Sequence, residues 1–465
     1  MSIKNLVGIC TSVILAGTVL CVNCYATDYE LDRIIVTAKK GIGKEIRRIP
    51  ANITVITSED IESSNARSIP DLLNGEMGIS VQDWLGNGKK VSIDMGGFGE
   101  VSSSNCLVLI DGRRINAVDM SNVDWSQVSL SQVERIEIIR GANSVFYGDN
   151  AVGGVINIIT KKGQEKQQVK VKTLMNTPNG ISTSVGLGGL VSGFTYSLNA
   201  GYGSSTGFRK NNAMEAYDIG ARLSGNPLPW LSVDVSSGFH NDVTGMPGPV
   251  TAAQWRAGQY AEAKTPNDYT TTKDQYFRVS VGEELLGKRL MLETLLGWRK
   301  IYNRQVAYPL WDSAWSMWFS GTYNNRDLSV LSWSQKCFYE LGPISARVGI
   351  EGEYGTYDVI VTDTYGAFGG SDERIIRNTI GTYASGDISL LDNNFLITVG
   401  IRREYADHSF DSSVYSTTVI TTRDVSSEML DAYSAGLSYS VTKNLIVFGS
   451  INKILNFLNL IISFK

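Results

Sequence analysis

The side chains that most often carry chemistry are scarce in this chain, which has two histidines and five cysteines. His240-Asn241-Asp242 sets an imidazole near a carboxylate, a pair that could contribute to a metal site. A lone histidine with one nearby acid is more often a polar loop residue, and we interpret it so. Gly41-Ile42-Gly43-Lys44 lacks the spacing and the Ser or Thr of a phosphate loop, and no His-Glu-x-x-His or nucleophile elbow occurs. We therefore expect no catalytic residue, no metal and no cofactor, which leaves binding as the chemistry of the chain.

An apolar leader opens the chain. A positive start, an apolar run over 6–20 and the small-x-small sequence Cys24-Tyr25-Ala26 predict a secretory signal peptide over residues 1–26. The alternative is a membrane anchor, but the run is shorter than the ~20 residues that a helical span needs. The other three cysteines leave with this leader. Cys106 and Cys337 remain, far apart in sequence, and predict neither a disulfide framework nor a zinc site.

The most informative spacing lies between residues 137 and 160. Glycines at 141, 148, 153 and 154 punctuate two apolar runs, 136–139 and 155–159. The pattern predicts a strand, a tight polar loop and a second strand, with backbones too close for side chains between them. Upstream, the apolar run 107–110 followed by Asp111-Gly112 predicts a further strand and a turn.

These positions together resemble the plug fingerprint of TonB-dependent outer-membrane receptors, which runs Ile-Glu-x-x-Arg-Gly, then Tyr-Gly, then Gly-Gly-x-Ile-Asn-Ile. The matching positions here are Asp111, Gly112, Arg140, Gly141, Tyr147, Gly148, Gly153, Gly154 and Asn157. The resemblance covers nearly all of residues 30–163. It implies a mostly β fold, with an N-terminal α/β plug domain over 27–163 inside a large antiparallel transmembrane β-barrel over 166–465.

A short β-prone segment follows the leader: Asp32, Arg33, Ile34, Ile35, Val36, Thr37 and Ala38. It resembles the TonB box of the family, whose usual form is acidic-x-Val-Val-Thr-Ala. An exposed segment of this kind near a terminus suits strand addition to the sheet edge of a partner, here TonB. The alternative is an ordinary first strand of the plug.

The chain departs from the family pattern at Gly96, where the family usually carries arginine. In the family that arginine helps to lock the plug to glutamates of the barrel, a pair whose charges would be costly to leave unpaired. The resemblance leaves Arg140 for this lock. It also implies a ligand site on the lumen wall and the plug apices, including the loop from Ala142 to Asn150.

From residue 166 onward the pattern has period two. One face of a predicted strand carries Phe194, Tyr196, Leu198, Ala200 and Tyr202, and the same alternation recurs over 231–239, 395–402 and 433–439. An apolar outer face and a polar inner face are typical of a water-filled barrel in lipid. A β-sandwich with one solvated face would alternate in the same way. The leader, the plug resemblance and the aromatic content favour the barrel.

The predicted links between strands are of two kinds. Links 391–394 and 441–444 are short and suit periplasmic turns, whereas 203–216, 241–274 and 303–326 are long and polar and suit the extracellular side. The last of these carries Tyr308, Trp311, Trp315, Trp318 and Phe319. We interpret these aromatic residues as part of an interfacial girdle; the alternative is a patch that stacks on a planar ligand.

Composition sets further bounds. After the leader no apolar run reaches the length of about 18 residues that would indicate a spanning helix, and a net charge of −4 argues against nucleic acid. The residues after 166 suffice for about 12 to 15 strands, whereas the family uses 22. The alternation is lost after Lys453. We therefore expect an incomplete barrel and a truncated or frame-shifted receptor.

The resemblance implies a receptor for TonB-dependent active uptake of a scarce nutrient in the outer membrane of a Gram-negative bacterium. TonB, outer-membrane lipid and a small ligand would be its partners, and the protein would be a monomer. A ferric siderophore or cobalamin is the expected ligand, while two histidines disfavour haem. Two alternatives stay open: a passive porin-like channel with a constricting N-terminal domain, and a non-functional fragment.

Overall fold

The computed structural model describes residues 35–36, 44–45, 51–66, 68–83, 88–116, 121–176, 180–312, 317–319, 321–363, 369–415, 419–442 and 445–454. All of them belong to the contact unit Ile35–Lys465. The predicted signal peptide and five residues of the predicted TonB box, 32–34 and 37–38, lie outside the described residues. The remaining two form β1 (Ile35–Val36), which pairs with β2 (Lys44–Glu45).

Five strands of the N-terminal part form a mixed sheet in the order β3-β8-β9-β6-β7. Their bounds are β3 Asn52–Ile56, β6 Cys106–Ile110, β7 Arg113–Arg114, β8 Val133–Arg140 and β9 Gly154–Thr160. Only the β6–β9 pair is parallel among these neighbours. The two apolar runs that flank the glycines are thus paired strands, β8 and β9, as predicted. We refer to the described residues of 51–160 as the plug.

Short helices cover this sheet, and their starts follow from capping side chains. α2 (Ser58–Ser63) begins at a capping box formed by Thr57 and Asp60, and α3 (Ile69–Leu73) begins at Ser68 with Pro70 in its first turn. The remaining plug elements are β4 (Ser80–Asp83), β5 (Val91–Asp94), η3 (Gly99–Ser104), η4 (Trp125–Gln127), η5 (Leu130–Gln132) and α4 (Ser144–Tyr147). The alternate isoleucines of β8 and β9 are fully buried against these elements, which makes this sheet the core of the plug.

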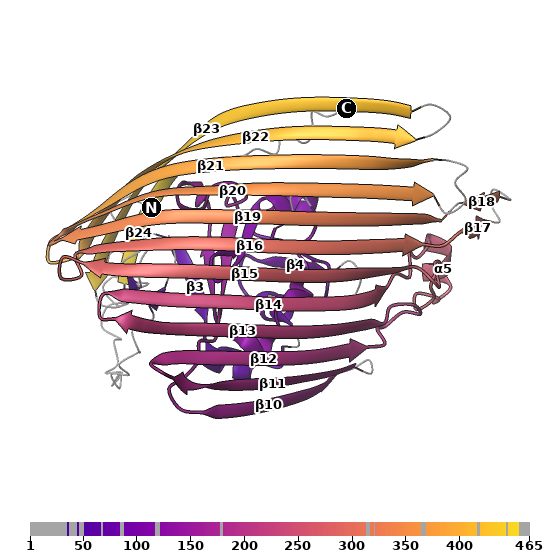
Figure 1. The fold of residues 1–465 in the computed structure, drawn as a ribbon, viewed down its shortest axis with the longest axis horizontal. Helices are drawn as coiled ribbons and strands as arrows, with labels where there is room; N and C mark the ends of the chain where they lie inside the picture. Colours follow the sequence, from indigo (N-terminus) through magenta and orange to yellow (C-terminus); the bar gives the residue numbers. More distant parts are fainter. Residues whose placement is uncertain are drawn as a thin grey trace, which may run out of the picture. The chain divides into compact units, whose positions relative to one another are not determined.

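The second part is one antiparallel sheet of 13 described strands, paired in chain order (Figure 1). The strands are β10 (Gln168–Asn176), β11 (Gly180–Val191), β12 (Phe194–Ser205), β13 (Met214–Leu228), β14 (Leu231–Gly245), β15 (Tyr269–Leu285), β16 (Leu290–Ala307), β19 (Thr322–Leu341), β20 (Ile344–Asp363), β21 (Gly370–Leu390), β22 (Phe395–Tyr415), β23 (Val419–Thr442) and β24 (Leu445–Lys453). The number falls within the predicted range. We call this sheet the wall.

The predicted alternation of the wall is confirmed by burial. On β12 Leu198 is 45% exposed while Ser197 is 7% exposed, and on β22 Val399 is 53% exposed while Thr398 is 4% exposed. The polar residues therefore face the plug, and the apolar residues face away from it. None of the helices among the described residues is long and apolar enough to cross a membrane.

The links of the wall alternate in length. Short turns such as Ser192-Gly193 use left-handed backbone conformations, φ 50° and 81°, and the predicted turn 391–394 does the same. The three long links are shorter than predicted, because β12 continues to Ser205, β14 to Gly245 and β16 to Ala307.

Two of the long links carry small elements of their own. α5 (Ala252–Arg256) lies between β14 and β15, and a hairpin of β17 (Leu310–Asp312) and β18 (Met317–Phe319) lies between β16 and β19. This hairpin extends beyond the ends of the wall strands (Figure 1). Three of the predicted girdle aromatics, Trp311, Trp318 and Phe319, therefore belong to a loop hairpin and not to the wall strands.

Candidate functional site

The boundary between plug and wall is built from ion pairs and hydrogen bonds. Asp111, which follows β6, accepts hydrogen bonds from the backbone N–H and Oγ1 of Thr160 at 3.0 and 2.6 Å. Arg222 of β13 lies 3.4 Å from Asp111 and donates to the backbone oxygen of Thr160 at 3.0 Å. Asp111 and Arg222 are nearly buried, at 7% and 9% side-chain exposure. Asp111, one of the fingerprint residues, thus joins the plug to the wall.

A second contact joins the plug to β15 and β16. The Arg299 guanidinium is held by Asp274 at 2.7 Å and donates to Oε1 of Gln127 in the plug, also at 2.7 Å. The guanidinium carbon of Arg113 lies 4.2 Å from the ring centroid of Tyr276, a cation–π contact. Burial, and then the charge of Arg299, lower the pKa of Arg113 to about 10.

A third contact involves the fingerprint loop. Asp149 pairs with Arg377 of β21 at 2.9 Å. A Cβ at Gly148 would lie 2.6 Å from the Glu404 carboxylate and 2.7 Å from the Arg402 guanidinium. Gly148 also has φ 76°, so glycine is required both by the backbone and by the ion cluster beside it.

The expected latch is organised differently from the family pattern. Arg402 of β22 pairs with Glu351 at 2.8 Å and with Glu404 at 2.6 Å. The wall itself therefore supplies the cation for its own glutamates. Arg140 hydrogen bonds to the oxygen of Met77, to Thr54 and to Glu76, all within the plug. Its expected part in the lock stays a prediction, while the ion pairs described above cross the boundary elsewhere.

The other fingerprint residues fix the plug fold. The buried carboxylate of Glu137 accepts from Arg135 at 3.0 Å and from Asn157 at 3.2 Å, which compensates its charge. A Cβ at Gly153 would lie 2.0 Å from the oxygen of Met95, and one at Gly154 2.5 Å from the Met95 side chain. The chain at Met95 passes so close to residues 153 and 154 that only glycine fits at both positions.

The loop from Ala142 to Asn150, expected to contact ligand, contains α4. The side chains of Ser144, Val145, Phe146 and Tyr147 are all buried. Val145, Phe146 and Tyr147 pack in one cluster with Ala432 of β23. In this conformation the side chains of α4 pack against other residues and are not exposed. Their burial does not support the expected contact between this loop and a ligand.

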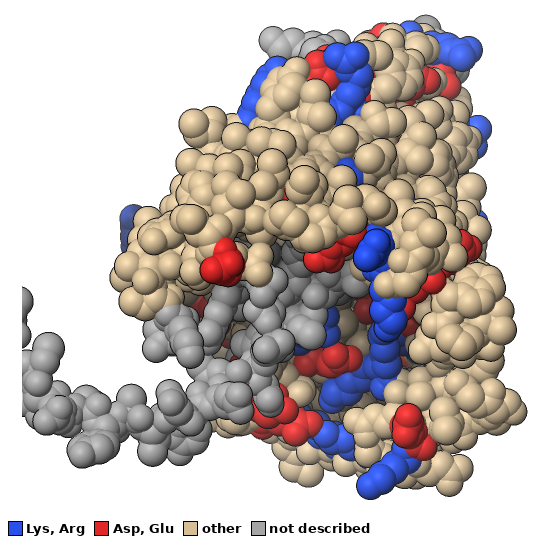
Figure 2. Space-filling view, turned by 90° about the vertical axis from the view of Figure 1, so that its left-hand side faces the viewer, with Lys and Arg blue, Asp and Glu red and all other residues tan. Residues whose placement is uncertain are grey.

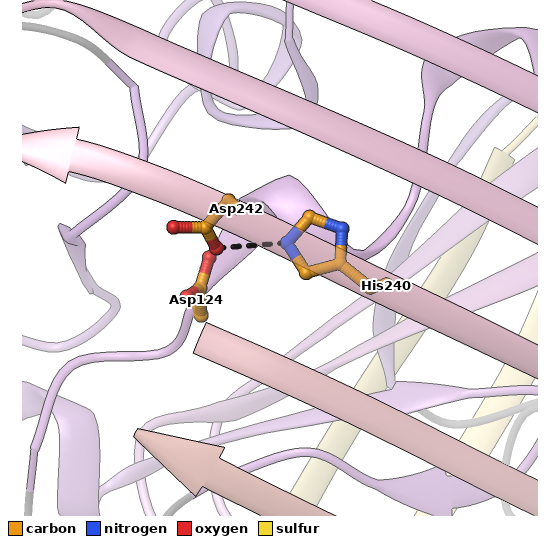
Figure 3. A group of neighbouring side chains, drawn as sticks. All are labelled: Asp124, His240 and Asp242. Carbon is orange, nitrogen blue, oxygen red and sulfur yellow. Dashed lines mark hydrogen bonds and ion pairs between the residues drawn. The ribbon is translucent and has the colours of Figure 1, made fainter. Parts of the chain in front are cut away.

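A cluster of polar and charged side chains joins the plug to β13, β14 and β15, and Figure 3 shows three of its members, Asp124, His240 and Asp242. His240 Nδ1 lies 2.7 Å from Asp218, and its Nε2 lies 2.9 Å from Asp242. Lys89 of the plug donates to Asp242 and, at 3.0 Å, to Thr272. Burial alone would raise the pKa of Asp124, but the Lys89 and Lys90 charges outweigh it and hold this pKa well below its ordinary value.

Our interpretation of His240 as a polar loop residue was wrong. The residue is on β14 and only 3% exposed. The alternation of β14, with Ser232, Asp234 and Ser236 on its polar face, continues to His240 and Asp242, and this was the signal that could have placed them inside.

A cavity of about 650 Å³ lies between plug and wall. The plug contributes Arg113, Arg114, Glu134 and Arg135, and the wall contributes Arg222, Arg278, Glu293, Lys336, Glu351, Arg377 and Glu404. Figure 2 faces the end with the short links and shows basic and acidic side chains gathered in a hollow there. The lining carries both signs of charge among apolar side chains such as Leu107 and Leu292.

The long links display an aromatic group that sequence reasoning missed. Phe208 and Tyr260 stack at 6.1 Å between centroids, and Trp255 of α5 lies 5.7 Å from Tyr260. The three rings are 60%, 45% and 68% exposed. Arg209 braces the loops beneath them by hydrogen bonds to the oxygens of Gly248 and Glu262. The contacts join two links that are distant in sequence, so neither link alone predicts the group.

The fold and the site define a plug domain packed against an open antiparallel sheet of the receptor-barrel type, in which the first and last described strands, β10 and β24, do not pair with each other. Residues 45–155 match the family model of the TonB-dependent receptor plug domain, and residues 173–460 match that of the TonB-dependent receptor-like β-barrel. The chain belongs to the TonB-dependent receptor family, whose members are transporters of the Gram-negative outer membrane and not enzymes.

Among curated relatives, the vitamin B12 transporter BtuB of Vibrio cholerae is 36% identical over 159 residues, which is 34% of this chain and 23% of BtuB. BtuB of Photobacterium profundum is 34% identical over 149 residues, 32% of this chain and 24% of the relative. These matches span about a quarter of the length of the relatives.

Among solved structures, the unliganded ferric citrate transporter FecA has a TM-score of 0.76 at 17% identity, covering 90% of this chain and 65% of FecA. The ferric yersiniabactin receptor FyuA of Yersinia pestis has a TM-score of 0.75 at 12% identity, covering 86% and 64%. At these identities the likeness concerns the fold.

Proposed function

We propose that this protein is an outer-membrane receptor for TonB-dependent active uptake of a small nutrient. The observation that carries the proposal is the anchoring of the plug to the wall at separate strands, β13, β14, β16 and β21, by buried charged groups. Breaking one buried pair typically costs about 3–5 kcal/mol. Passage past the plug therefore requires work, which a passive pore cannot supply and an energised partner can.

The segment Asp32 to Ala38 is proposed as the contact for TonB. It includes β1, a two-residue strand that pairs with β2. A short β-prone segment of this kind can exchange its pairing for the sheet edge of a partner. In this scheme residues 1–26 are the signal peptide, 27–163 the TonB box and plug, and 166–465 the barrel, acting as a monomer in outer-membrane lipid.

The ligand is proposed to be cobalamin or a ferric siderophore. Curated relatives are named vitamin B12 transporters, and similar folds are named as ferric siderophore and ferric citrate receptors. The ligand would arrive at the long links, where the rings of Phe208, Tyr260 and Trp255 are exposed. Exposed aromatic rings offer contact area to such ligands at a low cost in side-chain entropy.

The test is uptake of radiolabelled cyanocobalamin, and of ferric siderophores, by cells that depend on this chain. Val36→Pro removes a backbone N–H and should abolish uptake while leaving surface binding intact, whereas Val36→Ile is the matched control. A passive channel would be indifferent to both variants and to the loss of TonB. Equal uptake by the two variants would therefore favour the channel alternative.

A further inference from the structure

Asp124, His240 and Asp242 form a compact group at the β14 anchor, and the proposed uptake uses only the Lys89–Asp242 pair of it. One ligand atom from each residue can be chosen so that all lie within 4.8 Å of one another, and all three residues are buried. Asp124 precedes η4 in the plug, and the other two residues are on β14, so the group straddles the boundary (Figure 3).

One atom of the group has no hydrogen bond among the described residues. Oδ2 of Asp124 is buried and accepts no hydrogen bond from any residue in the part of the chain that the structure describes. It forms an ion pair with the Lys89 ammonium at 3.7 Å, which is beyond hydrogen-bonding distance. Buried carboxylate oxygens normally have a partner, because leaving one without is costly.

The orientation of His240 is that of a metal ligand. Asp218 holds Nδ1 at 2.7 Å, which aims Nε2 at the two carboxylates of the group. Metal-binding histidines commonly have a carboxylate on the other ring nitrogen, because it fixes the ring and makes it a better donor. Ser126 adds a hydroxyl 3.1 Å from Nε2.

We propose that Asp124, His240 and Asp242 bind a divalent transition-metal ion of the zinc class, which joins the plug to β14. One imidazole and two carboxylates suit such an ion, whereas calcium and magnesium favour oxygen ligands alone. The ion takes the position of the Lys89 ammonium beside Asp242, so this ammonium must move away from both Asp242 and Thr272. The imidazole binds through Nε2, and the proton on that nitrogen is released to solvent.

The experiment measures Zn²⁺ bound to the purified full chain by equilibrium dialysis, with Co²⁺ as a spectroscopic probe of nitrogen and oxygen ligation. Wild type should bind Zn²⁺ stoichiometrically, and His240→Gln should lose the site. His408→Gln, at the only other histidine of the chain, is the matched control and should bind normally. Asp218→Asn should weaken binding about 10–100-fold, as expected for the loss of a carboxylate that orients a ligand.

Lys89→Met is a second test, because it removes the competing ammonium and should tighten Zn²⁺ binding. Misfolding would not produce such a gain. Equal Zn²⁺ binding by wild type and His240→Gln would overturn the proposal. So would the absence of Zn²⁺ binding by both wild type and Lys89→Met.

Discussion

The Arg402 guanidinium lies 2.8 Å from the Glu351 carboxylate, and both residues belong to the wall. In the family pattern a plug arginine meets the glutamates of the barrel, but this chain has Gly96 at that position. Here the wall glutamates are neutralised from within the wall. The plug is held instead by Asp111, Lys89 and Asp149, each of which pairs with a different wall strand. Release of the plug thus requires separate ion pairs to break.

The Asp111–Arg222 pair should bear part of the plug anchoring. Asp111→Asn keeps the left-handed backbone, which Asn tolerates, but removes the charge opposite Arg222. We expect a loss of about 1–3 kcal/mol in unfolding free energy, because Arg222 loses the Asp111 charge but keeps Asp234 at 2.8 Å. Thermal unfolding measures this loss. Single-channel conductance in bilayers measures the accompanying leak of ions past the plug. Glu262→Gln, which breaks the exposed Lys210–Glu262 pair, should change neither; a comparable loss there would contradict the argument.

Gly148→Ala should damage the plug–wall contact more than its backbone angle alone explains. The new Cβ would lie 2.6 Å from Glu404. Gly97→Ala is the matched control, since Gly97 also has a positive φ of 82° but no atom within 4 Å of its Cβ. The control should cost about 1–2 kcal/mol, and Gly148→Ala clearly more. Limited proteolysis of the plug and the melting temperature measure the difference. Equal effects of the two variants would mean that the Glu404 and Arg402 side chains can move aside at little cost.

Cys106 should resist alkylation in the folded protein. Burial raises the pKa of its thiol, so the reactive thiolate stays scarce even at mildly alkaline pH. Peptide-resolved labelling with iodoacetamide between pH 7 and 9 should modify Cys106 only after denaturation. Cys337 is half-buried on β19 and provides the comparison within the same chain. Native-state labelling of Cys106 that rises with pH would show that β6 opens.

Trp255→Ala should weaken ligand binding without affecting the fold. The ring is 68% exposed and contacts only loop aromatics among the described ring pairs. An aromatic contact contributes about 0.5–1.5 kcal/mol beyond its area, so a drop of up to roughly tenfold in affinity for cyanocobalamin is expected. Trp230→Ala, at the end with the short links, should leave affinity unchanged. Equal affinities of both variants with wild type would move the ligand site away from this aromatic group.

Local sequence patterns predicted the strands and helices, because each of these elements is formed by residues that are close in sequence. The alternation of residues such as Leu198 and Val399 predicted which face of the wall is polar, and the glycines between 141 and 154 predicted the strand pair β8 and β9. The anchoring contacts could not be predicted this way. Lys89 and Asp242 are 153 residues apart, and Asp149 and Arg377 are 228 apart, so only the tertiary fold brings them together. The contacts of His240 with Asp218 and Ser126 were missed for the same reason, although the alternation along β14 could have placed the residue inside.

The contact of α4 with β23 also constrains the order of assembly. Phe146 and Tyr147 leave the ribosome long before Ala432, the wall residue that completes their cluster. Contacts between residues so distant in sequence form late, because closing the intervening loop costs entropy. Until then the apolar surface of α4 is uncovered and prone to association with other chains. A periplasmic holding factor, or insertion of the wall before the plug docks, would protect it during this interval.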